Sequence, residues 1–558
     1  MKDARMPLWR EWSGLQRAAV LLLLIAGSIE ILAGIALPFA GYDTYNHIYW
    51  IGEWHKLWSA GIFYPRWLPD SFSGFGAPTF YFYPPLTYIL SSTLYATMPG
   101  MTPESIGKIL ALLALAFSGL SMWLYLRWRV SEYRGPQTNV HATPVFGALL
   151  YMFAPYRFFD YSTRGALSEH VSLTFVPLLF WGIDYIIERR GSRDSSRGFM
   201  LLVGSLSLLI LTNLPTAVVA ILGVAIYALA QSGKARRRAM TWGAAGTISA
   251  CFLCAFYLLP AYLFAGDAQV ERLWTPVPMA SISPLTAIFT GETITIDIYS
   301  LMMFLGAAVL LAALFRDRKH NRGIFAMLLA VLVLQLPIIS YYLFSFVPPF
   351  TVAQLPYRFS ILVLVVAAVL WQHELHSKSK HTASILVAGW SLATIALIVV
   401  SFAKFHIHPD DRLPVGDAPE YASRWEHPPT FQKHGQQAYL NFASALAAPF
   451  TNDSQSIQLP SGGRTSLAKR AAFSDTIDYT SEISGPALLR RSYWPLWRAT
   501  IDGMPATTEA DSLGRLTITV PNGRHRLIVW LVPSNSAKVG AWISVGALII
   551  VCLLWTIV

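Results

Sequence analysis

The sequence predicts a polytopic α-helical membrane protein with about 12 transmembrane helices and a β-sandwich-like domain before the last of them. Of its 558 residues, 54% are hydrophobic and 13% are charged, whereas ordinary soluble domains have roughly 25% charged residues. Apolar runs of about 20 residues, the length that crosses a bilayer, recur along the chain. Near the C-terminus, LTITV and HRLIVWLV alternate or run apolar over strand lengths, which is typical of β-strands.

The basic residues predict the topology. The formal net charge is +11, but Lys and Arg gather in short clusters between apolar runs, as in cytoplasmic loops, which excludes a nucleic-acid-binding stripe. If all clusters are cytoplasmic, an even number of crossings separates each pair. Leu86–Met98, which is short for a span, is then an interfacial or re-entrant helix. The expected crossings lie at about 18–38, 104–126, 143–159, 169–187, 199–213, 215–231, 240–263, 298–315, 323–346, 360–373, 383–402 and 538–557.

This topology divides the chain into three parts. Residues 1–402 form a transmembrane domain with a long first external loop at 41–103, residues 403–537 form an extracytoplasmic β-rich domain, and residues 538–558 form the final span. Asp502-Gly503 and Asn522-Gly523 are hairpin-turn signals, because glycine supplies the positive φ that such turns require. We expect both termini to lie in the cytoplasm.

Asp43 is the main candidate for chemistry in the first external loop. It directly follows the first apolar run and is surrounded by aromatic residues. Partial desolvation there would make it a better base for a substrate hydroxyl. The alternative is an N-cap of a helix at 44–59, a position that Asp favours. His47, four residues later, is either a hydrogen-bond partner of Asp43 or a structural interfacial histidine.

Further charged residues lie at the external ends of later spans. Arg358 begins a crossing, where a guanidinium suits a phosphate or a plain phospholipid headgroup equally well. Arg157 and Arg164 pose the same choice. Glu169 and His170 are either a second acid/base pair or an ordinary loop end.

Other sequence features add little to the candidate chemistry. Asp410-Asp411 could bind a metal, and the alternative is a solvated connector. The sequence contains no phosphate-binding loop, nucleophile elbow or zinc-protease motif.

Several short motifs carry a resemblance to a known family. They are G-x-x-Y-P-R-W at 61–67, G-x-G-x-P at 74–78, F-Y-P-P-L at 82–86, A-P-Y-R-F at 154–158, R-G-A-x-x-E at 164–169 and YWPLWRATIDG at 493–503. The pattern resembles bacterial membrane proteins described as 6-pyruvoyl-tetrahydropterin synthase-related, which are similar to the GT-C superfamily of membrane glycosyltransferases. The ending resembles YfhO-type proteins. The resemblance covers nearly the whole chain.

The resemblance implies a protein of the bacterial cytoplasmic membrane that transfers a sugar from a polyprenyl-phosphate carrier to an acceptor on the external face. The acceptor is a glycan, lipid or protein of the cell envelope. Our hypothesis is an inverting transfer. In that superfamily an acidic residue of the first external loop is the usual base, and Asp43 occupies this place. The acidic pair found in some members is absent, because Thr44 and Tyr45 follow Asp43. This departure favours a site without a metal, and no other cofactor is expected.

The expected roles follow from this resemblance. Asp43 is the base, and Glu169 orients acceptor or donor hydroxyls. The residues expected to bind the donor phosphate are Arg358, Arg164, Arg66 and Arg157. Those expected to contact substrate are His47, Tyr45, Trp67, Tyr83 and His170. The alternatives are a transporter of a lipid-linked glycan or small solute, and a scaffold subunit of an envelope-glycan assembly complex.

Overall fold

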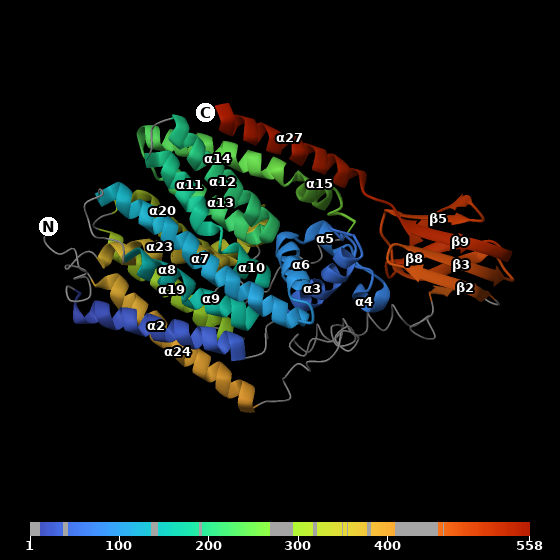
Figure 1. The fold of residues 1–558 in the computed structure, drawn as a ribbon, viewed down its shortest axis with the longest axis horizontal. Helices are drawn as coiled ribbons and strands as arrows, with labels where there is room; N and C mark the ends of the chain where they lie inside the picture. The colour runs from blue at the N-terminus through green and yellow to red at the C-terminus, as the bar shows by residue number, and fades with distance from the viewer. Residues whose placement is uncertain are drawn as a thin grey trace.

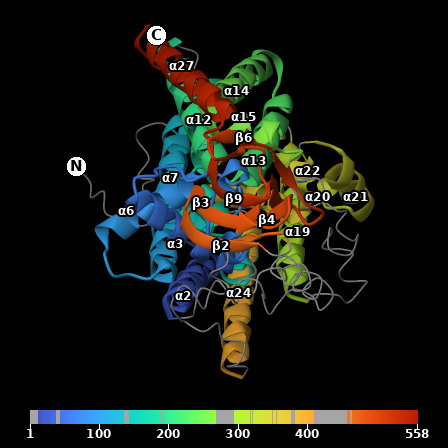
Figure 2. The same ribbon diagram turned by 90° about the vertical axis from the view of Figure 1, so that its right-hand side faces the viewer.

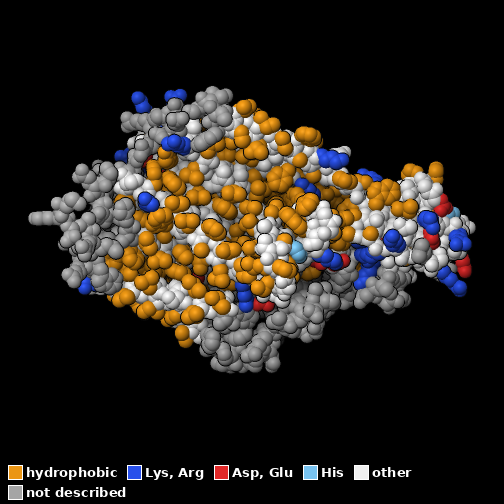
Figure 3. All heavy atoms as spheres, viewed as in Figure 1, with side chains coloured by type: hydrophobic (Ala, Val, Ile, Leu, Met, Phe, Trp, Pro, Cys, Tyr) orange, Lys and Arg blue, Asp and Glu red, His pale blue; other side chains and the backbone are white. Residues whose placement is uncertain are grey.

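The computed structural model describes residues 12–36, 43–134, 143–188, 192–267, 294–315, 318, 321–348, 350–353, 355–375, 381–407, 456–460 and 463–557. Figure 1 shows a bundle of long helices at one end and a β-sandwich at the other. Apolar side chains cover the face of the bundle seen in Figure 3. Such a surface is stable in lipid rather than in water, and the chain is a multi-pass membrane protein.

Seven of the described helical segments are long and apolar enough to cross a membrane, and two bent pairs raise the number to nine. The seven are α2 (Gly14–Ala36), α7 (Pro103–Arg134), α10 (Leu167–Ser172) with α11 (Val176–Glu188), α12 (Ser192–Thr212), η2 (Pro356–Phe359) with α23 (Ser360–Glu374), α24 (Thr382–Ile407) and α27 (Asn535–Ile557). The pairs are α14 (Gly233–Leu253) with α15 (Ala255–Leu263), and α20 (Arg322–Leu334) with α21 (Pro337–Phe346).

Five further helices complete the bundle: α8 (Thr143–Met152), α9 (Pro155–Phe158), α13 (Leu214–Leu229), α19 (Ile294–Leu314) and α22 (Phe350–Ala353). Each expected crossing falls on one of these helices or pairs. Several of them, such as α8 with 10 residues, are shorter than a full span. The number of twelve crossings therefore stays a prediction.

The bend of 78° between α14 and α15 is stabilised by α27. The Ser544 hydroxyl accepts a hydrogen bond from the Phe256 amide at 3.0 Å and donates one to the Phe252 carbonyl at 3.2 Å. Gly540 permits this approach, because a Cβ there would lie 2.4 Å from the Ala255 carbonyl oxygen. A neighbouring helix thus satisfies backbone groups that the break frees, as the low polarity of a membrane requires.

The expected first external loop is mostly helical. It contains α3 (Thr44–Ser59), α4 (Ser71–Gly74), α5 (Thr79–Phe82) and α6 (Leu86–Thr97), which together form what we call the helical cap. The helix expected at 44–59 has these bounds, and the short helix expected at 86–98 is α6. The cap has its own core, in which Trp54, Phe80 and Tyr88 are fully buried.

The C-terminal strands form two packed antiparallel sheets. One has the order β1 (Ile457–Gln458), β4 (Gly485–Ser492), β8 (Arg515–Val520), β7 (Thr508–Ala510). The other has the order β2 (Arg464–Ala471), β3 (Ser474–Ser481), β9 (Gly523–Leu531), β5 (Trp497–Ile501), β6 (Met504–Ala506). The strands therefore occupy the later part of the expected β-rich domain.

One of the two expected hairpin turns is confirmed. Asp502 and Gly503 have φ of 49° and 85° and connect the paired strands β5 and β6. The expectation for Asn522-Gly523 is wrong, because β8 and β9 belong to different sheets. There the positive φ of Gly523 turns the chain from one sheet to the other.

Aromatic packing attaches the sandwich to the helical cap. The Trp67 ring meets the Trp497 ring edge-on at 5.6 Å, and Tyr81 packs on Trp494 at 5.3 Å. The Ser492 amide donates a hydrogen bond to the Phe75 carbonyl at 2.8 Å. Figure 2 looks onto this end, where the sandwich lies in front of the helices.

Gly165 lies where the cap meets the bundle. It follows a π-helical turn, η1 (Phe159–Arg164), and has a φ of 68°. A Cβ at this position would lie 1.8 Å from the Thr44 hydroxyl oxygen, at the start of α3. Only glycine combines this backbone conformation with so close an approach.

We predict that Gly165→Ala lowers the free energy of unfolding by about 2 kcal/mol or more, because the left-handed conformation and the contact with Thr44 both become costly. Thermal unfolding of the detergent-solubilised protein measures this loss. Gly204→Ala is the control, because a Cβ there meets nothing within 4 Å and alanine is the better helix former. Equal melting temperatures for the two variants would contradict the packing described here.

Candidate active site

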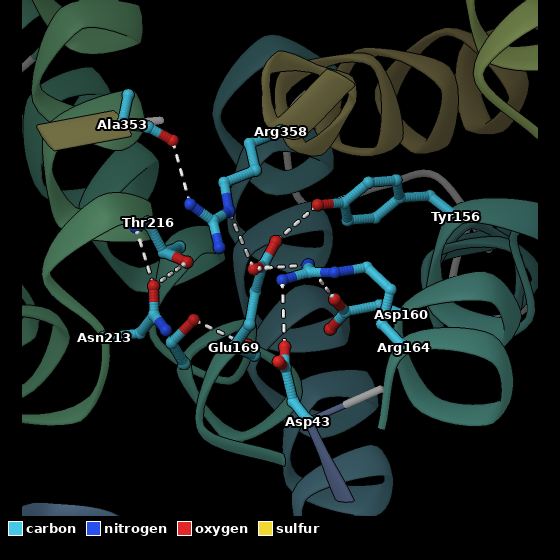
Figure 4. A network of polar contacts seen from close by, with 10 residues as sticks. Asp43, Tyr156, Asp160, Arg164, Glu169, Asn213, Thr216, Ala353 and Arg358 are labelled. Carbon is cyan, nitrogen blue, oxygen red and sulfur yellow. Dashed lines mark hydrogen bonds and ion pairs between the residues drawn. The ribbon is translucent and has the colours of Figure 1, made fainter. Parts of the chain in front are cut away.

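Arg164 is the centre of a cluster of charged side chains where the helical cap meets the bundle. Its Nη1 atom donates to Asp160 Oδ1 and to Glu169 Oε2, each at 2.8 Å. Its Nη2 atom lies 3.4 Å from Asp43 Oδ2. Figure 4 shows these carboxylates converging on one guanidinium. The arrangement connects α3, η1 and α10 through a single side chain.

Glu169 is buried, with 1% of its side chain exposed, and has three side-chain donors. Arg164 and Arg358 bind its Oε2 atom, the latter through Nε at 3.0 Å, and the Tyr156 hydroxyl donates to Oε1. Arg358 also donates from Nη1 to the Ala353 carbonyl at 2.9 Å. Glu169 is thus enclosed by these partners, which favours a role in holding the two arginines. The expectation that it orients substrate hydroxyls stays a prediction.

The sequence Pro-Tyr-Arg-Phe occurs twice, at 155–158 and 356–359, and the two copies have similar structures. Both copies form a short helical turn with proline at its start, α9 and η2, and both arginines are buried. Proline suits this position because it has no N–H to satisfy there. Their partners differ: Arg358 binds Glu169, whereas Arg157 lies 5.7 Å from the Tyr151 ring centroid and 3.4 Å from His170 Nε2.

Asp43 is the most accessible carboxylate of the cluster, with 45% of its side chain exposed. It occupies the N-cap position of α3, but its side chain makes no capping hydrogen bond. Its backbone N–H donates to the Arg164 carbonyl at 2.7 Å, which fixes the position of the residue. The structure thus leaves the carboxylate beside a guanidinium and open to solvent, which is compatible with a base.

His47 lies one turn after Asp43, but its ring faces the cap core. Its Nδ1 atom is 2.8 Å from the Tyr88 hydroxyl, and only 2% of the residue is exposed. Burial lowers the pKa of His47 to about 4, although the negative charge of Asp43 opposes this shift. The imidazole is therefore neutral at pH 7. The structure favours a packing role for His47 over a hydrogen bond to Asp43.

Tyr83 and Tyr45 are the other expected substrate contacts close to Asp43. The ring of Tyr83 packs on Trp50 with centroids 4.7 Å apart. Burial raises the pKa of Tyr83, and the nearby Asp43 charge adds to this effect. Tyr45 is half-buried in the first turn of α3. These aromatic residues form the cap side of the site.

The remaining expected site residues lie elsewhere. Arg66 donates to the Phe256 carbonyl at 2.9 Å and stacks on Tyr64 at 4.0 Å, so it joins the cap to α15. Trp67 is 1% exposed in the core shared with the sandwich. His170 has Nε2 3.2 Å from the Ala111 carbonyl and does not pair with Glu169. These three side chains have structural contacts in this arrangement, and their expected phosphate, substrate and acid/base roles stay predictions.

Asp160 and Tyr156 belong to the cluster but were not among the expected site residues. The signal for Asp160 is its spacing of four residues before Arg164, which places the two on one helical face. The position of Tyr156 beside Glu169 has no comparable local signal.

The described residues contain no group of three or more His, Cys, Asp or Glu side chains that could hold a metal ion. Asp410-Asp411 lies outside the described residues. The metal-free site therefore remains a prediction.

An apolar groove of about 420 Å³ lies close to the charged cluster, between α6, α7 and the α10–α11 segment. Val171 and Thr174, which follow Glu169 on the same segment, contribute to its wall. Its other lining residues are Leu90, Thr93, Leu94, Leu110, Leu113, Ala114, Phe117, Leu120, Ser121, Leu124, Phe175 and Leu178. Such a lining suits a hydrocarbon chain.

Comparison with known proteins gives distant structural likenesses. No family model and no curated protein matches the sequence. The mycobacterial arabinofuranosyltransferase AftD is 15% identical with a TM-score of 0.43, over 68% of this chain and 26% of that chain. The oligosaccharyltransferase of Archaeoglobus fulgidus is 14% identical with a TM-score of 0.39, over 69% and 56%. This chain thus spans only part of either enzyme, and neither likeness establishes an activity.

We predict that His47→Gln removes part of the acid sensitivity of the protein. The folded-state pKa of His47, about 4, is below the ordinary value of 6.5, so protons bind the unfolded chain more tightly. The stability contributed by this histidine is complete above pH 6.5 and is lost as the pH falls toward 4, by at most about 3 kcal/mol. Unfolding free energies of both proteins between pH 4 and 7 test this.

The comparison with the variant is needed because Glu53 changes the pH dependence of stability in the opposite direction. Its burial, and then Asp70, raise the pKa of Glu53 to about 7, so its contribution to stability is lost as the pH rises. The difference between wild type and His47→Gln isolates the histidine. Parallel pH curves for the two proteins would show that His47 is not buried in this way.

Proposed function

We propose that the protein is a membrane glycosyltransferase that transfers a sugar from a polyprenyl-phosphate carrier to an envelope acceptor on the external face of the cytoplasmic membrane. One observation carries the proposal: a half-exposed carboxylate, Asp43, is held beside a buried guanidinium close to an apolar groove. The motifs that resemble GT-C glycosyltransferases support it. The arabinofuranosyltransferase AftD and the oligosaccharyltransferase are also named for the transfer of sugars.

Asp43 acts as the general base. It accepts the proton of an acceptor hydroxyl while the hydroxyl oxygen bonds to the anomeric carbon of the donor sugar. The bond from that carbon to the carrier phosphate breaks, and its electron pair leaves with the phosphate. Attack opposite the leaving group inverts the anomeric configuration. Arg164, at 3.4 Å, holds the Asp43 carboxylate in place.

Glu169 acts indirectly in this proposal, as a positioning residue. It binds both Arg164 and Arg358 through the same oxygen atom, at 2.8 and 3.0 Å. Glu169 holds both guanidiniums in fixed positions, and Arg164 also contacts Asp160 and Asp43. Positive charge held near a phosphate leaving group is a large contribution to catalysis. Arg157 and Arg66, whose contacts lie elsewhere, are not assigned to this role.

The groove binds the hydrocarbon part of the carrier. Along α7 its lining extends from Leu110 to Leu124, which corresponds to roughly 21 Å of helix. Val171 brings the groove within two residues of Glu169 on the chain. A carrier in the groove would therefore place its phosphate near the charged cluster, with its tail facing the bilayer.

The distribution of basic residues supports the external location. Arg129 lies near the end of α7 and binds Asp184 of α11, at the opposite end of α7 from the helical cap. Arg197 lies in the first turns of α12, and Lys234–Arg238 lies in the first turns of α14. Positive residues favour the cytoplasmic side, so the cap and the sandwich are assigned to the external side.

We predict that Asp43→Asn reduces sugar transfer by about 10²-fold or more, because the amide cannot accept the proton. Mass profiles of envelope glycans are compared between matched cells with wild type, the variant at equal abundance, and no protein. The variant and the deletion should lack the same sugar. Asp70→Asn, which changes an exposed carboxylate of the cap, is the control and should resemble wild type.

If Asp43→Asn matches wild type while the deletion differs, Asp43 is not the base. The transporter or scaffold alternative then replaces the enzyme. If the deletion also matches wild type, the protein does not modify those glycans.

We predict that filling the groove weakens donor binding with little effect on the chemical step. Thr93→Trp places a large ring at the groove rim and should raise the KM for the lipid-linked donor about tenfold while kcat changes little. The matched control is Ala244→Trp, in a second apolar groove of about 300 Å³ between α12, α13 and α14. Equal kinetics for the two variants would exclude the first groove as the carrier site.

A further inference from the structure

Three arginines of the sandwich gather where it contacts the helical cap, a region that we call the seam. Arg470 is the last residue but one of β2, and Arg490 and Arg491 are consecutive on β4. Arg470 Nη2 donates to the Gly74 carbonyl of the cap and to the Arg490 carbonyl at 3.0 Å. The Arg490 guanidinium lies 5.7 Å from the Phe75 ring centroid. None of these contacts belongs to the charged cluster around Arg164.

An irregularity in β4 accounts for this gathering. The register of β4 with β8 shifts between Leu488 and Ser492, so Arg490 and Arg491 leave the regular pairing with that strand. A bulge of this kind redirects side chains that would otherwise alternate between two faces. Both consecutive arginines therefore lie close enough to Arg470 for their positive charges to lower its pKa.

The negative charge at the seam is already engaged. Asp475 binds Arg491 through both oxygens, at 2.9 and 2.8 Å, with both side chains almost fully buried. Asp70 is the other carboxylate whose negative charge raises the pKa of Arg470, and it forms an ion pair with Lys56. No carboxylate of the described residues forms an ion pair with Arg470. Arg470 therefore carries a positive charge that no carboxylate of the described residues neutralises by an ion pair.

Several donor groups at the seam remain unused. Arg470 uses only Nη2, and among the described residues its Nε and Nη1 groups have no hydrogen-bond acceptor. Arg491 is 1% exposed and its Nη1 atom is buried without a partner. Burial, and then the positive charge of Arg491, lower the pKa of Arg470 to about 10. A buried donor without an acceptor is costly, which applies to Arg491 Nη1. The half-buried Arg470 has N–H groups free to bind an oxyanion.

We propose that the seam between sandwich and helical cap is a binding site for a phosphate group, with Arg470 as its principal ligand. Guanidinium N–H groups match phosphate oxygens in geometry and charge. A bound phosphate would also relieve the repulsion between Arg470 and its two neighbours. The phosphate belongs either to an anionic lipid headgroup or to a soluble molecule. The site is independent of the glycosyltransferase assignment, since it shares no residue with the charged cluster.

Thermal unfolding of the full-length protein in phosphatidylcholine nanodiscs tests this site. Inorganic phosphate is titrated at constant ionic strength, with chloride as the balancing anion. The wild-type melting temperature should rise by about 2 °C, and Arg470→Gln should lose most of this rise. Arg526→Gln is the matched control, because Arg526 is exposed on β9 and binds Asp478. It should keep the wild-type response.

The phosphate-dependent shift is the readout, so a general loss of stability in the variant does not affect the interpretation. Arg470→Lys keeps the charge and should retain part of the shift. No rise in wild type, or an equal rise in Arg470→Gln, overturns the proposal. A second series replaces the added phosphate with nanodiscs that contain phosphatidylglycerol. An Arg470-dependent rise there identifies a lipid headgroup as the source, and a response to free phosphate alone identifies a soluble ligand.

Discussion

The buried carboxylate of Glu169 is the interaction on which the site depends. It accepts hydrogen bonds from Arg164, Arg358 and Tyr156, which lie on different elements. Removing one partner of a buried ion pair typically costs about 3–5 kcal/mol, because the other charge is left without compensation. The cluster therefore behaves as a unit. Since Arg164 also fixes Asp43, the order of the whole site follows from one carboxylate that never meets solvent.

The helical cap determines how this cluster meets its surroundings. Along one face of α3 the side chains pass from half-exposed Asp43 through buried His47 to fully buried Trp54. The open end of this gradient is the end that faces the cluster. Close packing at Gly165 brings the start of α3 against the turn that carries Arg164. A carboxylate can thus be accessible while its partner is held rigidly.

The sandwich packs directly on the helical cap, and this contact fixes its position. Trp67 and Tyr81 of the cap belong to the same buried cluster as the sandwich core. Aromatic side chains contribute large buried areas and specific edge-to-face geometry, so this contact orients the sandwich on the cap. Arg66 and the turn between α14 and α15 add a connection to the bundle through the Phe256 carbonyl. The membrane part and the sandwich therefore share one continuous structure around the site.

The sequence by itself determined the features that depend on local composition. Apolar runs predicted the helical bundle, strand-like runs predicted the sheets, and the helix at 44–59 and the turn at Asp502-Gly503 followed from short-range signals. The external charges could be named one by one, but not their pairing. Glu169 and Arg358 are 189 residues apart, and no local preference indicates that they meet.

Tertiary structure also decided which aromatic and basic residues are free. Trp67 and Arg66 are residue types common in binding sites. In the structure Trp67 packs on the sandwich, and Arg66 donates a hydrogen bond to α15. Asn522-Gly523 has the residues of a hairpin but connects two sheets. In each case the residue type permits several partners of similar energy. The choice among them depends on which distant surface the fold brings into contact, and that information is absent from any short stretch of sequence.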